Sequence, residues 1–349
     1  MGSASTTART MKAGQWDPKQ KKVVVNEVPI PEPGPNEILV KITSASLCHT
    51  DIISIERPGL EEPFTPGHEG VGIINRIHPS ADGKGYQLGD AIGFLYILGC
   101  CFECEACMVH NLLCTNGKPE LSGFTKPGFF AEYAIVDYRN AIHLPEQWSL
   151  KTSSVFFCAG MTAFHAVDSC DLRPGQWLGV IGAGGLGQIA TQYAKAMDLN
   201  VVAIDINDKT LEVCKAQGAD TIFNSRTDQD YVSKIKDLTK GGVHAAAVFS
   251  NAKVAYADAP NIIRAGGLLM AIGLTDEPLK ISTMDLALGR YRIKSEGPGI
   301  PQRLRKAVDF SAKHNIAPEV QLRKLEELDD MVKEMRAGTA TKRMAVTFD

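Results

Sequence analysis

Four cysteines occupy one short stretch of the chain at a spacing that suits a metal ion. Cys101, Cys104, Cys107 and Cys114 follow one another in steps of 3, 3 and 7 positions. Four thiolates so close in sequence are typical of a closed, tetrahedral, all-sulfur zinc site, which staples a loop that has little core of its own. An iron–sulfur cluster also takes four cysteines and is the alternative. We interpret Cys100 as a spectator or a substitute ligand.

A second set of metal-ligand residues is dispersed along the chain. It lies in the segments Cys48-His49-Thr50-Asp51, Gly67-His68-Glu69-Gly70 and Cys158-Ala159-Gly160. No segment is persuasive alone, because a single histidine or cysteine is more often packed in a core. Together they offer two thiolates, one imidazole and a nearby carboxylate, which could hold zinc with one position left open. Such an ion stays able to polarise a bound oxygen, so the set predicts a catalytic zinc.

A glycine-rich turn supplies a third signal. The apolar run 177–181 is followed by Gly182-Ala183-Gly184-Gly185-Leu186-Gly187, then by a helical apolar period and a second strand that ends in Asp205. This is the βαβ context that a dinucleotide-binding fingerprint requires. Gly182 allows the tight turn, Gly184 lets the backbone approach a pyrophosphate at the helix N-terminus, and Gly187 allows close packing. Asp205 can bond both ribose hydroxyls and would repel a 2′-phosphate, which favours NAD over NADP.

The elements that must position these groups fall into two regions that differ in composition and in hydrophobic pattern. The first 155 residues are rich in glycine, proline and short apolar runs, whereas apolar runs alternate with helical periods from about residue 156. We predict an α/β protein with a β-rich domain over 1–155, a doubly wound parallel-sheet domain over 156–295, and a tail over 296–349 that returns to the first domain. The expected strands include 23–25, 38–42, 70–77, 131–136, 177–181, 200–205, 219–223, 245–249, 268–273 and 343–348, and the expected helices include 211–217 and 302–314.

The composition restricts the function class. The chain has 349 residues, 44% of them hydrophobic, and a formal net charge of −3. This charge gives no electrostatic reason to expect nucleic-acid or membrane partners. No apolar run is long enough for a transmembrane helix, and the first ten residues lack the layout of a secretory signal. With nine cysteines and no export signal we expect free or metal-bound thiols and a cytoplasmic location.

In combination these motifs resemble those of the zinc-containing alcohol dehydrogenases of the medium-chain dehydrogenase/reductase superfamily. The resemblance runs from about Lys12 to Phe348 and includes the segments 67–72 and 158–162. It implies a GroES-like catalytic domain, a Rossmann coenzyme domain, NAD, and two zinc ions per chain, one catalytic and one structural. Zinc held by two cysteines and one histidine is the arrangement known from alcohol dehydrogenases. The implied reaction is reversible hydride transfer between an alcohol and an aldehyde or ketone.

The resemblance also implies roles for single residues. Cys48, His68 and Cys158 would hold the catalytic zinc, with Glu69 as an alternative ligand and Asp51 orienting the histidine. Thr50 would take the substrate proton and Tyr96 would form an aromatic wall of the substrate pocket. The residues expected to contact the coenzyme are His49, Gly182, Gly184, Gly185, Leu186, Gly187, Asp205, Lys209 and Arg343. The family also implies a homodimer or homotetramer.

Two departures from the family pattern stand out. The step from the third to the fourth structural cysteine is 7 positions, where the family usually has 8, so the lobe is expected to be reshaped. Many members end a proton relay with a histidine at the position of Ile53, which cannot carry a proton. The relay must then stop at Thr50 and the ribose, or pass to water.

Two other functions are compatible with parts of the sequence. A zinc-independent reductase of the same superfamily would share the fold, but such relatives lack the cysteine and histidine ligands found here. A zinc- and nucleotide-binding redox sensor that uses Cys100 or Cys101 would share the thiols, but it would not need the complete set of catalytic ligands. The sequence favours the alcohol dehydrogenase and leaves its particular substrate open.

Overall fold

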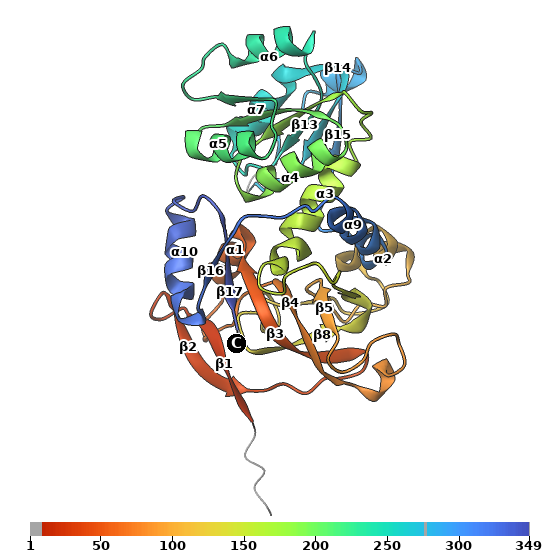
Figure 1. Cartoon of the computed structure of the whole chain (residues 1–349), viewed down its shortest axis with the longest axis vertical. Coiled ribbons are helices and arrows are strands. Elements are labelled where there is room, and N and C mark those ends of the chain that lie inside the picture. Colours follow the sequence, from red (N-terminus) through yellow and green to blue (C-terminus); the bar gives the residue numbers. More distant parts are fainter. Residues whose placement is uncertain (1–8, 276–277, 349) are drawn as a thin grey trace, which may run out of the picture. The chain divides into compact units, whose positions relative to one another are not determined.

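A computed structural model describes residues 9–275 and 278–348. They form two compact units (Figure 1). The first unit comprises residues up to Cys158 together with Ile300–Arg305 and Glu319 onward, and the second comprises Ala159–Gly299 and Lys306–Pro318. The predicted outer bounds, residues 1 and 349, lie outside the described residues.

The first unit is built on a seven-stranded, mostly antiparallel sheet. A long central strand, β3, pairs along its length with three neighbours, and its alternating apolar side chains are buried with the rings of Phe94, Phe129 and Phe130. The order is β16 (Val320–Arg323), β17 (Arg343–Thr347), β3 (Glu37–Leu47), β4 (Glu69–Ile77), β5 (Ala91–Phe94) and β9 (Ala141–His143), with β8 (Tyr133–Asp137) also on β3.

Smaller elements complete this unit. They are the hairpin β1 (Thr10–Asp17) and β2 (Lys22–Pro29), the short pair β6 (Ile97–Leu98) and β7 (Glu120–Leu121), and the helices α1 (His49–Ile55), α2 (Glu105–Val109) and α10 (Leu328–Arg336). Strand β17 pairs antiparallel with β3, so strands that lie far apart in the sequence are neighbours in one sheet.

The second unit is a six-stranded parallel sheet with crossover helices. The order is β12 (Thr221–Asn224), β11 (Asn200–Asp205), β10 (Trp177–Ile181), β13 (Val243–Val248), β14 (Ile263–Ala271) and β15 (Tyr291–Ser295). The order reverses at β10, and right-handed crossovers therefore put the helices before and after the reversal on opposite faces. The helices are α3 (Ala159–Asp168), α4 (Gly185–Ala196), α5 (Asp208–Ala216), α6 (Tyr231–Thr239), α7 (Lys253–Ile262) and α8 (Thr283–Ala287). The predicted α/β class is confirmed.

The tail is divided, whereas the sequence predicted one return over 296–349. Helix α9 (Pro301–Lys313) begins in the first unit and ends in the second. Its second half belongs to the second unit because the ring of Phe310 packs on Phe164 and the hydroxyl of Ser311 lies 2.6 Å from that of Tyr193. Only the later part of the tail, from residue 319, returns to the sheet of the first unit.

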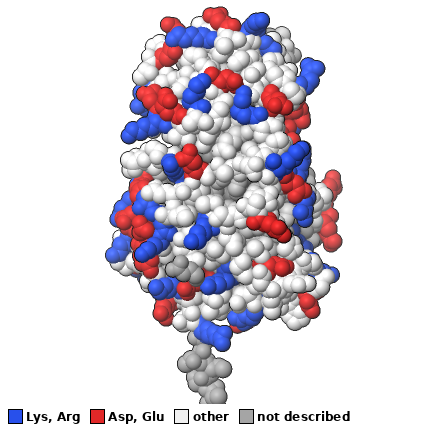
Figure 2. Space-filling model, in the orientation of Figure 1, with Lys and Arg blue, Asp and Glu red and all other residues white. Residues whose placement is uncertain are grey.

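The surface of the described residues mixes both signs of charge. On the face drawn in Figure 2, basic and acidic side chains are interspersed rather than gathered by sign. Among the described residues, no helix is both long and apolar enough to cross a lipid bilayer.

Candidate catalytic and coenzyme sites

Cys48, His68 and Cys158 meet inside the first unit although the sequence separates them widely. Cys48 is the N-cap of α1, His68 directly precedes β4, and Cys158 follows the 3-10 turn Ser153–Phe157. Their ligand atoms and one carboxylate oxygen of Glu69 all lie within 4.8 Å of one another. The structure therefore places these four residues together, whereas the sequence linked them only because their side chains are of metal-binding types.

Asp51 fixes two of these three residues with one carboxylate. Its Oδ2 accepts a hydrogen bond from the backbone N–H of Cys48 at 2.9 Å and caps helix α1, while its Oδ1 lies 2.6 Å from Nδ1 of His68. Because the carboxylate can only accept, it holds the Nδ1–H tautomer of the ring. The lone pair of Nε2 is then directed at the sulfur atoms, as a metal ligand requires.

The spacing of these atoms fits zinc. Nε2 of His68 lies 3.3 Å from Sγ of Cys158. The edges of a tetrahedron built from Zn–S bonds of about 2.3 Å and Zn–N bonds of about 2.0 Å are roughly 3.5–3.8 Å long, close to this separation. A hydrogen bond from Cys158 lowers the pKa of Cys48 against the opposing effect of burial, and His68 lowers it further, which favours a thiolate at Cys48. The same hydrogen bond raises the pKa of Cys158. Burial opposes protonation of His68, but Asp51 outweighs it and raises the pKa of the imidazole.

Glu69 is completely buried and held by two partners. Its Oε2 accepts hydrogen bonds from the hydroxyl of Ser46 and from the guanidinium of Arg343 on β17. Its other oxygen, Oε1, has no hydrogen-bond partner within the described residues. Burial raises the pKa of Glu69 to about 7 against the opposing charge of Arg343. The unpartnered oxygen suits the alternative-ligand role, while Arg343, expected at the pyrophosphate, is bonded to this carboxylate.

An aromatic wall stands beside the histidine. Tyr96 meets the ring of His68 edge-on at 5.2 Å between centroids, and Phe124 meets it at 5.4 Å. Burial raises the pKa of the Tyr96 phenol, which keeps it neutral. The sequence had indicated Tyr96 but not Phe124, which lies in a loop whose pattern gives no signal for it.

The other residues around the first ligand lie on helix α1. The hydroxyl of Thr50 is 3.6 Å from Sγ of Cys48, so it is next to the position a metal would take. His49 is exposed at the start of the helix. Ile53 is 47% exposed and offers no polar atom, so no side-chain relay continues through it.

The four-cysteine group also closes into a cluster, in the lobe that holds α2. One sulfur from each of Cys101, Cys104, Cys107 and Cys114 lies within 4.8 Å of the others. Sγ of Cys101 is 3.9 Å from that of Cys107 and 3.6 Å from that of Cys114, distances that fit a tetrahedral all-sulfur zinc site. Backbone N–H groups of Thr115 and Cys107 lower the pKa of Cys104 to about 5, which favours its thiolate. The shortened step therefore still allows four converging sulfurs.

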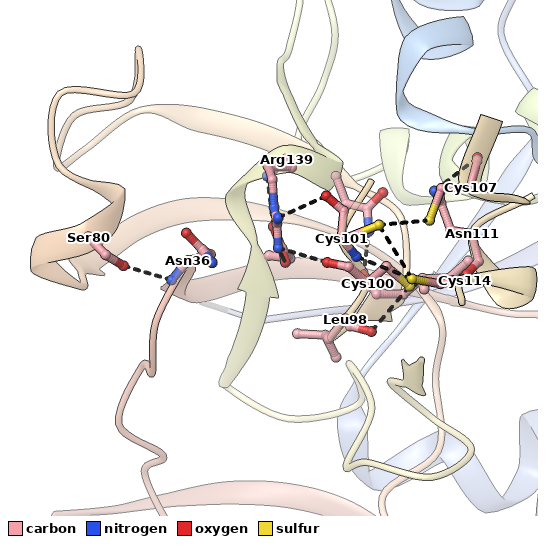
Figure 3. A network of polar contacts seen from close by, with 12 residues as sticks. Asn36, Ser80, Leu98, Cys100, Cys101, Cys107, Asn111, Cys114 and Arg139 are labelled. Atoms are coloured by element: carbon pink, nitrogen blue, oxygen red, sulfur yellow. Dashed lines mark hydrogen bonds and ion pairs between the residues drawn. The ribbon is translucent and has the colours of Figure 1, made fainter. Parts of the chain in front are cut away.

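Cys100 lies outside this cluster of described residues. Its thiol donates to the carbonyl of Asn111 at 3.2 Å, and burial raises its pKa to about 12. This supports the spectator interpretation. Figure 3 shows how Arg139 holds the start of the lobe: its guanidinium donates to the carbonyl oxygens of Cys100 at 3.1 Å and Cys101 at 3.3 Å. The same group pairs with the carboxylate of Asp137 at 2.7 Å.

The glycine-rich turn of the second unit joins β10 to α4. Gly182 has a φ of +95°, and a Cβ there would lie 2.9 Å from the backbone nitrogen of Ser250. A Cβ on Gly187 would lie 2.0 Å from the carbonyl oxygen of Gly182. At Gly184, the N-cap of α4, a Cβ would meet nothing within 4 Å. Gly182 and Gly187 are thus required by the close backbone packing of the turn. Gly184 leaves open space at the N-terminus of α4, which begins with Gly185 and Leu186.

A cavity of about 380 Å³ lies at the carboxyl ends of β10 and β11. Gly182 and Asp205 line it with Ser225, Arg226 and Ser250. One oxygen of Asp205 accepts from the N–H of Ala183 at 2.6 Å, which ties the carboxylate to the glycine turn.

The rim of this cavity differs in part from the expectation. Lys209, on the first turn of α5, is exposed and is not among the residues that line the cavity. Arg226 lines it and was missed, because it stands in a loop with no motif.

Comparison with known proteins gives the same assignment over nearly the whole chain. Residues 34–146 match the family model "Alcohol dehydrogenase GroES-like domain" and residues 185–313 match "Zinc-binding dehydrogenase". An alcohol dehydrogenase of Geobacillus stearothermophilus is 34% identical over 347 residues, which cover 97% of this chain and 100% of that protein.

Solved structures share the fold. The alcohol dehydrogenase of Aeropyrum pernix superposes with a TM-score of 0.86 at 27% identity, covering 97% of this chain and 100% of that one. Acetophenone reductase from Geotrichum candidum, solved in complex with NAD, has a TM-score of 0.83 at 23% identity, with 99% of each chain covered. The chain belongs to the zinc-containing alcohol dehydrogenase family, whose members are oxidoreductases that act on CH–OH groups.

Proposed function

We propose that the protein oxidises an alcohol with NAD and reduces the matching aldehyde or ketone in reverse, using Cys48, His68 and Cys158 to hold a catalytic zinc. The observation that carries the proposal is the meeting of these three ligand atoms with a histidine tautomer fixed by Asp51. When bound, zinc supplies a Lewis acid for the substrate oxygen and NAD supplies the hydride acceptor. Cys101, Cys104, Cys107 and Cys114 would hold the structural zinc.

The side chains around the ligands have separate tasks in this proposal. Thr50 accepts the hydroxyl proton of the alcohol, because its hydroxyl lies beside Cys48. Tyr96 and Phe124 exclude water and shape the apolar side of the substrate pocket. Glu69 would offer Oε1, which has no hydrogen-bond partner within the described residues, as an alternative ligand, while Arg343 balances its charge.

The coenzyme is proposed to bind the glycine turn Gly182–Gly187 and the cavity that contains Asp205. The carboxylate favours a free ribose 2′-hydroxyl over a 2′-phosphate, and NAD is present in the acetophenone reductase structure. Arg226, a cation on the rim of the same cavity, would lie near the adenosine half. We propose Lys209 and His49 as weaker coenzyme contacts, because both are exposed.

Two broader properties accompany this function. None of the nine cysteines, all of them among the described residues, forms a disulfide, which supports the proposal of a cytoplasmic, reducing location. A homodimer or homotetramer is proposed from family membership, and light scattering on the purified protein would measure it.

One experiment tests the function directly. Metal content and NADH formation from a panel of alcohols are measured for the wild type, for Cys48→Ala and for the control Cys170→Ala, which removes a buried thiol of the second unit that belongs to neither ligand set. We expect two zinc ions per wild-type chain, and one in Cys48→Ala with no turnover but intact NADH binding. The control should keep two zinc ions and its activity. Full activity in Cys48→Ala would reject the assignment of the catalytic zinc.

A further inference from the structure

A cavity of about 490 Å³ opens at the amino ends of the parallel strands in the second unit. It is lined by the segment 169–173 that follows α3 and by residues in the first halves of β13, β14 and β15, including His244, Arg264 and Arg292. Gly182 and Asp205 stand at the carboxyl ends of the same sheet. The cavity is therefore separate from the proposed coenzyme site.

The lining carries a surplus of positive charge. Four cations face the cavity: Arg173, Arg264, Arg292 and Lys294. Among the described residues that line the cavity, Asp171 is the single carboxylate; it is 85% exposed and 3.8 Å from Lys294. Within the described residues, the guanidinium groups of Arg173 and Arg292 have no hydrogen-bond partner, so their donors are available. Like charges that line one cavity repel one another, and a bound anion would offset that repulsion.

Arg264 is held in place at the wall of this cavity. Its Nη2 donates to the carbonyl oxygens of Thr239 at 3.2 Å and Lys240 at 3.1 Å. Its Nη1 lies 2.5 Å from Nε2 of His244. The guanidinium is thus anchored by backbone on one side and meets the imidazole on the other.

His244 cannot satisfy both of its neighbours. The backbone N–H of Trp177 donates to Nδ1 at 3.1 Å, while Nη1 of Arg264 faces Nε2. A guanidinium has only donors, and a neutral imidazole has a single lone pair. One of the two contacts therefore sets an N–H against another donor. Burial and the charges of Arg264 and Arg173 lower the pKa of His244, and protonation would in any case remove the last lone pair.

An anion in the cavity would resolve this conflict. Its oxygens would accept from Nε2–H of His244 and, once Nη1 of Arg264 turns away from that nitrogen, from Arg264 as well, leaving Nδ1 free to accept from Trp177. Further oxygens would accept from Arg173 and Arg292, the two cations whose donors are available. An acceptor with several charged oxygens is the ligand that matches this arrangement.

We propose that this cavity binds a small multivalent oxyanion of the phosphate class. The bound anion would connect the segment after α3 to the starts of β13, β14 and β15, and so stabilise the second unit. This site does not depend on the proposed chemistry at the cysteine and histidine ligands.

The test uses pyrophosphate as the probe and the zinc-loaded protein with saturating NADH, which fills the coenzyme site. Calorimetry compares the wild type with Arg173→Ala/Arg292→Ala and with the control Lys84→Ala/Lys236→Ala, which removes the same charge from exposed positions elsewhere. We expect one pyrophosphate per chain in the wild type and the control, and at least a tenfold weaker affinity in the cavity variant. NADH affinity, measured separately, should be equal in all three proteins and shows that the variants are folded.

Three results would overturn the proposal. Pyrophosphate binding that disappears once NADH is present belongs to the coenzyme site. Equal affinity in the cavity variant and the wild type shows an adventitious ion only. Equal weakening in the control shows a general charge effect. A failure of alcohol oxidation would leave all these readouts intact, so it is distinguishable from failure of the anion site.

Discussion

The double contact made by Asp51 can be tested by one substitution, Asp51→Asn. The carboxylate must accept from two donors, the N–H of Cys48 at 2.9 Å and Nδ1–H of His68 at 2.6 Å. An amide keeps only one acceptor oxygen and presents a donor on its other side. If the amide nitrogen faces His68, the ring turns to the Nε2–H tautomer and loses the lone pair aimed at the metal. If it faces Cys48, the cap of α1 is lost.

The expected loss of zinc affinity follows from the role of Asp51 in orienting the ligand histidine. Loss of the group that orients a ligand histidine weakens metal binding by about 10–100-fold, equivalent to about 1.4–2.7 kcal/mol. The assay is zinc competition with a chromophoric chelator, in which the four-cysteine site serves as an internal reference. We expect one zinc per chain to be lost at lower chelator concentration in Asp51→Asn, while the second is unchanged.

A matched control exists in the same unit. Asp90 also accepts from a histidine, His143, at 2.9 Å and from a backbone N–H, that of Gln87, at 2.7 Å. Both donors meet Oδ2 of Asp90, so Asp90→Asn makes the same substitution in a group that needs only one acceptor oxygen and that belongs to neither ligand set. It should leave both zinc affinities unaltered. Equal zinc retention in Asp51→Asn and the wild type would refute the reasoning, as would equal weakening in the control.

Two further perturbations address the other sites. Gly187→Ala places a methyl group 2.0 Å from backbone oxygen, so we expect destabilisation by roughly 1–3 kcal/mol and weaker NADH binding, measured by thermal unfolding and fluorescence titration; an unchanged melting temperature would contradict the close packing. Arg139→Ala removes the donors that hold two carbonyl groups of the four-cysteine lobe, so we expect faster zinc release from that lobe, measured with a chelator. Wild-type release kinetics would show that the lobe holds its own shape.

Much of this architecture was predictable because local patterns determine it. The apolar run 177–181 and the run 200–205 coincide with β10 and β11, since buried parallel strands are continuous apolar segments. The predicted strand 343–348 differs from β17 by one residue at its end, and the predicted helix 302–314 differs from α9 by one residue at each end. The four-cysteine lobe was predictable from spacing alone, because its ligands are local in sequence.

The remainder depends on contacts that no local pattern encodes. Phe124 reaches His68 from a loop, and Arg226 reaches the cavity of Asp205 from another. The pairing of Arg343 with Glu69 depends on the antiparallel register of β17 on β3, which joins distant segments. The division of α9 between the units depends on packing of its second half, which helical periodicity does not reveal.

The pairing of Glu69 with Arg343 sets an order of events during protein synthesis. The two residues are 274 positions apart, and ribosomes add roughly 5–20 residues per second, so about 14–55 s separate their appearance. Until strand β17 emerges, β3 has an open edge and the buried carboxylate lacks its counter-charge. The buried pocket around Glu69 is therefore complete only after β17 has paired with β3.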